Sequence, residues 1–128
     1  MYRIAVLAEK ENEGHKYTKL IKQLCERKGM FPRIIKYNNQ ESFFSNLLLD
    51  APTHALIAFS GITGLNTAER LHSLCPACRI IWFCDQDFSL HAFRLRADYF
   101  MLKPISDEEL EEGLSAWFGQ DGSCPLKA

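Results

Sequence analysis

The sequence alternates short apolar runs with amphipathic stretches from one end to the other, and this pattern constrains the fold more than any other feature. The first run, residues 4–7, reads Ile-Ala-Val-Leu and is flanked by charge, as expected of a strand that is buried on both faces. Similar runs recur along the chain. They predict strands at residues 4–7, 32–37, 55–59, 80–84 and 99–102.

Helical periodicity fills the intervals between these runs. From Tyr17 to Cys25, apolar side chains recur at i, i+3, i+4, i+7 and i+8, which predicts a helix that ends near Gly29. Further helices are predicted at residues 40–50, 65–74 and 88–95. A last helix opens with a capping box formed by Ser106 and Glu109. The side chains expected to face the core are Phe43, Phe44, Leu47 and Leu48 in the second helix and Leu110, Leu114 and Trp117 in the last.

Five strands that alternate with five helices favour an α/β fold with a doubly wound parallel sheet and helices on both faces. Ligands of such folds bind beyond the carboxyl ends of the strands, so residues at those ends are the candidates for function. No internal repeat divides the chain. Residues 1–119 are predicted to form one domain, and residues 120–128 have the composition of a tail or the start of a linker.

Composition excludes several classes of protein. The chain has 128 residues, of which 47% are hydrophobic and 24% charged, as in an ordinary globular domain. The net charge of −1 provides no general attraction for nucleic acid or an anionic membrane. No apolar run approaches the ~18 residues of a membrane span, and no signal-peptide pattern follows Arg3. We therefore expect a cytoplasmic protein.

Five cysteines in a chain of this length favour reduced thiols over a disulfide framework. Cys25 and Cys84 lie in apolar patterns and are expected in the core. Cys75 and Cys78 follow His72 at three-residue spacing and precede the fourth strand. This motif is interpreted either as a redox or metal-binding element, for which Cys124 is a further candidate, or as a turn with incidental cysteines.

Residues 92–105 carry a more specific signal. They read Ala-Phe-Arg-Leu-Arg-Ala-Asp-Tyr-Phe-Met-Leu-Lys-Pro-Ile. This run resembles the segment from the fourth helix through the fifth strand of response-regulator receiver domains (CheY-like), and most closely that of LytTR-type regulators. The resemblance implies a flavodoxin-like sheet of strand order 2-1-3-4-5. It also implies a cis bond between Lys103 and Pro104.

The same resemblance implies a phosphorylation site from which this sequence departs. In that family two acidic residues after the first strand hold Mg²⁺, an Asp that ends the third strand accepts a phosphoryl group, and a Ser or Thr and a Lys contact it. Here no Asp lies between Asp50 and Asp85. We therefore expect that aspartyl phosphorylation is lost, that Mg²⁺ binding is weak or absent, and that no cofactor is needed. The corresponding positions are Ala8, Glu9, Phe59 or Ser60, Cys84, Phe100 (the aromatic switch position) and Lys103.

The remaining groups of this degenerate site allow alternatives. Glu9 is either a residual Mg²⁺ ligand or a solvated loop acid, and Ser60 is a candidate acceptor with no evident base. Lys103 either remains available to bind an anion, or it has a structural role in which it hydrogen-bonds loop carbonyls or pairs with Glu9. The loop at residues 61–64 is shorter than that of the family. Residues 9–13 would repel phosphate, which disfavours an enzyme or cofactor binder of this fold.

Charge placement suggests how such a domain would act. Basic residues on the fourth helix and acidic residues on the fifth suit a symmetric dimer. The alternative is that the acidic residues at the start of the fifth helix only complement the dipole of that helix.

The sequence thus predicts a pseudo-receiver that is not an enzyme and contacts a protein partner or a second copy, but neither nucleic acid nor membrane. The alternative is a redox- or metal-responsive receiver that uses Cys75 and Cys78. The candidate dimer face comprises Arg94, Arg96, Asp98, Glu108, Glu111 and Glu112.

Overall fold

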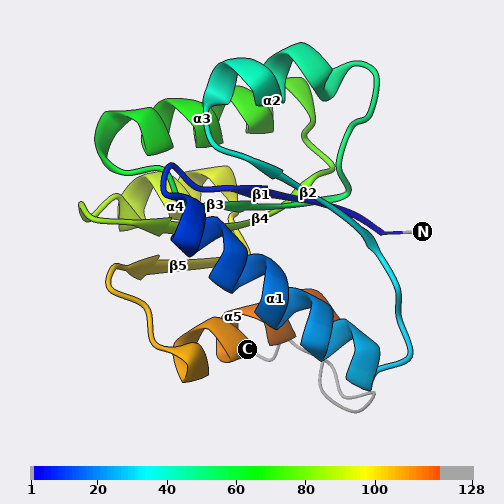
Figure 1. The fold of residues 1–128 in the computed structure, drawn as a ribbon. Coiled ribbons are helices and arrows are strands. Elements are labelled where there is room, and N and C mark those ends of the chain that lie inside the picture. The colour runs from blue at the N-terminus through cyan, green and yellow to red at the C-terminus, as the bar shows by residue number, and fades with distance from the viewer. Residues whose placement is uncertain (1, 119–128) are drawn as a thin grey trace.

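A computed structural model describes residues 2–118 as a single five-stranded parallel sheet with helices on both faces (Figure 1). The strand order is β2-β1-β3-β4-β5, which confirms the predicted fold class and order. The predicted tail, residues 120–128, lies outside the described residues. In chain order the elements are β1 (Arg3–Leu7), α1 (Glu11–Arg27), β2 (Arg33–Tyr37), α2 (Gln40–Leu47), β3 (His54–Ile57), α3 (Gly61–Leu74), β4 (Arg79–Cys84), α4 (Ser89–Leu95), β5 (Tyr99–Leu102) and α5 (Asp107–Phe118).

Two apolar layers enclose the sheet. Helices α2, α3 and α4 cover one face, where Phe43, Leu71 and Trp82 are fully buried, and α1 and α5 cover the other, where Ile21 and Leu110 are fully buried. The central strands β1, β3 and β4 therefore read as continuous apolar runs because both of their faces are covered.

The last helix begins as predicted. The Ser106 N–H donates to the Glu109 carboxylate at 3.0 Å, and the Glu109 N–H donates to Ser106 Oγ at 3.1 Å, so the capping box is formed. Leu110, Leu114 and Trp117 are buried, as their spacing predicts. No helix in residues 2–118 is long and apolar enough to cross a membrane.

Three local predictions were wrong. Leu48 is 95% exposed because α2 ends at Leu47. The residues expected as a loop at 61–64 form the first turn of α3, which begins at Gly61 rather than Leu65. Arg96 is not on α4, since that helix ends at Leu95 and Arg96 follows it in the left-handed conformation (φ 58°).

Candidate functional site

The strand pairing brings the carboxyl-edge residues together. In the parallel register Leu7 lies opposite Ile57, and Cys84 lies opposite Leu102. The Lys103 N–H donates to the Cys84 carbonyl at 2.8 Å, which extends the β4–β5 pairing by one residue. The Lys103–Pro104 peptide bond is cis, as the resemblance implies. Lys103 therefore projects from the sheet edge at which β1, β3 and β4 also end.

Lys103 contacts the segment between β3 and α3 and the helix α1. Its Nζ donates to the Ala58 carbonyl at 2.6 Å and to Ser60 Oγ at 3.5 Å. It also forms an ion pair with the Glu13 carboxylate at 3.1 Å. The expected contact with a carbonyl is present, but the acidic partner is Glu13 on α1 and not Glu9.

The sequence analysis missed Glu13. Tyr17, one turn further along α1, donates its hydroxyl to Glu13 Oε2 at 2.8 Å. Burial raises the pKa of Tyr17, and this hydrogen bond raises it further, so the phenol stays protonated. The i, i+4 spacing of Glu13 and Tyr17 was the available signal, since it places both side chains on the same helix face.

The end of β3 presents no carboxylate. Phe59 is fully buried and packs in the core beneath α2 and α3. Ser60 is partly exposed, and its N–H donates to the Glu9 carboxylate at 3.3 Å. The next N–H, that of Gly61, donates to Asp85 Oδ1 at 2.8 Å, and this hydrogen bond lowers the pKa of Asp85. Two backbone donors at the start of α3 thus already have carboxylate partners from neighbouring loops.

Three further predicted positions carry side chains without a strong hydrogen-bond donor. Ala8 and Cys84 are buried, and the Cys84 thiol lies 3.8 Å from the Gly61 carbonyl. Phe100 packs edge-to-face on Trp82, with ring centroids 5.2 Å apart. These side chains offer packing rather than hydrogen bonds to a bound anion.

The acidic residues at this edge do not fit a Mg²⁺ ion. Glu9 and Asp85 accept backbone N–H groups, and Glu13 is paired with Lys103. Within residues 2–118 no group of three or more His, Cys, Asp or Glu side chains is arranged to hold a metal. A hard divalent cation requires several oxygen ligands directed at one point, which these three carboxylates do not provide.

Cys75 and Cys78 form a turn in which the Cys78 N–H donates to the Cys75 carbonyl at 3.0 Å. Both carry thiols. Burial raises the pKa of Cys78 to about 12, so this thiol resists conversion to the reactive thiolate. Nothing in this geometry supports the redox alternative.

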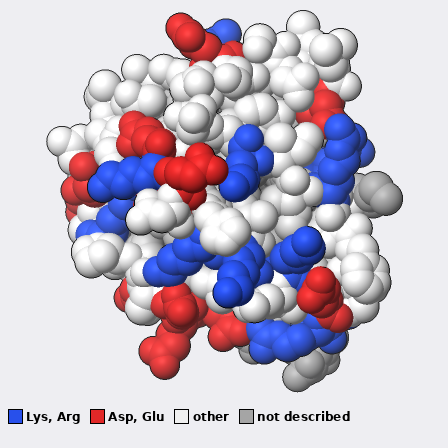
Figure 2. Space-filling view, viewed as in Figure 1, with Lys and Arg blue, Asp and Glu red and all other residues white. Residues whose placement is uncertain are grey.

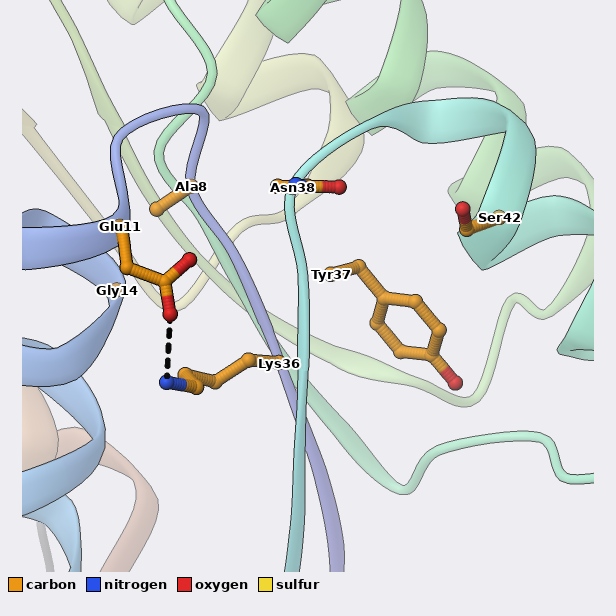
Figure 3. A pocket seen from close by; sticks show the side chains of 7 residues that line it. All are labelled: Ala8, Glu11, Gly14, Lys36, Tyr37, Asn38 and Ser42. Atoms are coloured by element: carbon orange, nitrogen blue, oxygen red, sulfur yellow. Dashed lines mark ion pairs between the residues drawn. The ribbon is translucent and has the colours of Figure 1, made fainter.

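A cavity of about 250 Å³ lies at the carboxyl ends of β1 and β2, away from Lys103. Figure 3 shows Lys36 and Glu11 on one side of β2 and the Tyr37 ring on the other. Lys36 and Glu11 pair with each other at 3.6 Å, and both are exposed. Among the predicted site residues only Ala8 lines this cavity. The cavity therefore does not coincide with the degenerate phosphorylation site.

Part of the surface charge is paired within the chain. Figure 2 shows basic side chains spread across the face on which α1 lies, with acidic side chains beside them. The ion pairs of the described residues include Lys16–Asp107 and Arg33–Asp50. Ion pairs with an exposed partner are screened by solvent and contribute little to stability.

The candidate dimer face is partly used inside the molecule. Asp98 accepts from Arg79 Nε at 3.1 Å and from Trp117 Nε1 at 3.2 Å, and Glu111 pairs with Arg27 of α1. Arg94 and Arg96 are exposed and have no carboxylate within ion-pair distance in the described part of the chain. Glu108 and Glu112 are also exposed.

No family model matches the sequence, and no curated protein matches it either. Its structure, however, resembles those of response-regulator receiver domains. The signal receiver domain of a DNA-binding response regulator (merR) from Colwellia psychrerythraea 34H has a TM-score of 0.75 at 16% identity, over 94% of this chain and all of that one. A CheY-like receiver domain protein from Methanospirillum hungatei JF-1 has a TM-score of 0.71 at 16% identity, over 90% and 91% of the two chains.

The response regulator DrrB, an OmpR/PhoB homolog from Thermotoga maritima, has a TM-score of 0.72 at 18% identity. The match covers 92% of this chain and 53% of DrrB, so this chain spans about half the length of that protein. These likenesses, together with the strand order, define the class of fold. The fold is that of the CheY-like receiver domains.

Proposed function

We propose that this chain is a receiver-type signalling domain of a two-component or transcriptional regulator, which acts in the cytoplasm through protein contacts and without an aspartyl phosphate. It is not an enzyme in this proposal. The observation that carries it is the end of β3, where the Phe59 side chain is turned into the core and Lys103 contacts the Ala58 carbonyl and Ser60 Oγ.

The chemistry of phosphoryl transfer supports the loss of phosphorylation. Transfer to this edge requires a carboxylate nucleophile and a cation that neutralises the phosphoryl oxygens. Ser60 offers a hydroxyl, but its neighbour Lys103 is paired with Glu13 and therefore provides no base for it. Glu9 and Asp85 are held by backbone donors rather than directed at one metal position.

A contact face is supported by exposed apolar side chains on α4 and β5. Phe93 is 80% exposed, and Leu90 and Leu102 are also exposed. Large exposed apolar groups that lie close together often mark interaction sites. Arg94 and Arg96 lie beside them, and α5 provides Glu108 and Glu112. We assign this face to a second copy of the chain, because a two-fold axis brings the basic residues of each copy toward the acidic residues of the other.

The intact mass of the protein after incubation with Mg²⁺ and acetyl phosphate tests the loss of phosphorylation. We expect no phosphoryl adduct under conditions in which a receiver domain that retains its Asp is modified. A stoichiometric adduct on any residue of this chain would overturn the proposal. Under non-reducing conditions the same spectrum also tests the redox alternative, for which a loss of two protons localised to Cys75 and Cys78 is required.

A further inference from the structure

The Lys103 ammonium is already surrounded by three oxygen atoms of its own chain. An ammonium has three N–H donors, and Nζ faces three acceptors: the Ala58 carbonyl at 2.6 Å, Glu13 Oε2 at 3.1 Å and Ser60 Oγ at 3.5 Å. An oxyanion from solution therefore competes with these oxygen atoms for Lys103. Glu13 is the charged one of the three and is the group that an anion would replace.

The Glu13–Lys103 pair differs from the other ion pairs of the described chain in its burial. The two side chains are 20% and 16% exposed, whereas every other pair has at least one partner more than 40% exposed. Tyr17 further fixes Glu13 through its hydroxyl. Charges in such partly buried positions interact more strongly and are screened less by salt than surface charges are.

Glu13 lies in a groove whose other charged residues are lysines. The groove has a volume of about 480 Å³ and runs between the start of α1 and the segment that follows β5. Lys16 pairs with Asp107 at the exposed rim, and Lys10 has no carboxylate within ion-pair distance among the described residues. The lining residues used here are Lys10, Asn12, Glu13, Lys16 and Lys103.

We propose that Glu13 is a built-in ligand of Lys103, which closes this groove to small oxyanions such as inorganic phosphate. A carboxylate held on the same chain competes at a high effective concentration, so an anion at millimolar concentration does not displace it. Removing the Glu13 charge leaves three lysines around the groove and opens it. The inference concerns reversible anion binding, and it stands or fails separately from the covalent phosphorylation tested above.

The Glu13→Gln variant tests this inference because glutamine keeps the shape and an acceptor for Tyr17 but removes the charge. The measurement is the thermal midpoint as a function of inorganic phosphate at constant ionic strength. Binding to the folded state raises the midpoint with ligand concentration, which gives an apparent Kd. We expect the Kd for phosphate to be at least about tenfold lower for Glu13→Gln than for the wild type.

Two controls separate this effect from a general change of charge. Glu11→Gln removes a carboxylate from the same turn of α1 and should leave the phosphate dependence at the wild-type level, since Glu11 pairs with Lys36. Adding Lys103→Met to Glu13→Gln should abolish the gain. The inference is overturned if Glu13→Gln gains no phosphate binding, if Glu11→Gln gains as much, or if the double variant retains the gain.

A measurement on the wild-type protein covers the case in which Glu13→Gln does not fold. Lysines are labelled with an amine-reactive ester in the native state, and the rates are followed by peptide mass spectrometry. We expect Lys103 to react at least about tenfold more slowly than Lys10, because its ammonium is held by three acceptors and is largely covered. Equal rates for Lys103 and Lys10 would contradict the built-in ligand.

Discussion

At the scale of single residues, His54 is a polar side chain buried among aromatic rings. It is 4% exposed and lies edge-on to Tyr2 and Trp117, with ring centroids 4.9 Å from each. Its Nδ1 is 2.8 Å from Thr53 Oγ1, so the ring is satisfied as a neutral group. Burial, and then the positive charge of Arg79, lower the pKa of His54 from 6.5 to about 4, although Asp98 acts in the opposite direction.

This shift predicts a loss of stability in mild acid. Below pH 6.5 the unfolded chain binds a proton at His54 that the folded chain does not bind until about pH 4, so stability falls as the pH falls through this window. Protonation of His54 lowers the free energy of unfolding by up to about 3 kcal/mol across this window. Urea unfolding at pH 7 and pH 5 should show a smaller loss for His54→Gln than for the wild type. The exposed His15→Gln serves as control and should follow the wild type, and an equal loss in His54→Gln would contradict the assignment.

At the scale of elements, the approach of α3 to the end of β3 depends on Gly64. A Cβ at this position would lie 2.2 Å from the Phe59 carbonyl oxygen and 3.4 Å from Trp82 Nε1. The first contact is with backbone, so the strand or the helix would have to move. Gly14 on α1 differs, since a Cβ there would meet Ala8 and Lys36 side chains at 3.6 and 3.7 Å, which are ordinary contacts.

The two glycines therefore predict stability changes of opposite sign. Gly64→Ala should lower the free energy of unfolding by about 2–4 kcal/mol, because it forces α3 away from β3. Gly14→Ala should raise it by up to about 1 kcal/mol, because alanine favours the helix and meets no clash. Urea unfolding of both variants at pH 7 measures the difference. A neutral Gly64→Ala would contradict a close contact between α3 and the Phe59 carbonyl.

The same elements show which parts of the fold and of the candidate site can be predicted from the sequence. Apolar runs and helical stripes predicted all five strands and five helices, because burial on one or both faces imposes its period on the sequence. Leu48 was misplaced because its spacing continues the stripe of α2, while the helix ends one residue earlier. Glu13 was missed because Glu9 directly follows the first strand and was therefore expected at the sheet edge. The partner of Lys103 instead depends on how α1 packs against the segment after β5, which is a tertiary feature.

At the scale of the whole molecule, the candidate dimer face near β5 combines charges without an ion-pair partner among the described residues with exposed apolar side chains. This strand lies at the edge of the sheet, with α4 covering one face and α5 the other. Phe93 and Leu102 expose apolar surface there, and Arg94 has no acidic partner in residues 2–118. Two copies related by a two-fold axis would bury this apolar surface, while the charges at its border would set the orientation of the partners.

The proposed dimer predicts a specific response to charge reversal. Sedimentation equilibrium at tens of micromolar should show a dimer for the wild type and a monomer for Arg94→Glu, because the new carboxylate would face Glu108 and Glu112 of the other copy. Lys22→Glu reverses an exposed charge on α1, on the opposite face of the sheet from α4, and should remain dimeric. Combining Arg94→Glu with Glu112→Arg should restore association, because the complementary pairs are exchanged rather than lost. A monomeric wild type at this concentration, or a dimer that Arg94→Glu leaves intact, would exclude this interface and direct attention to a different protein partner.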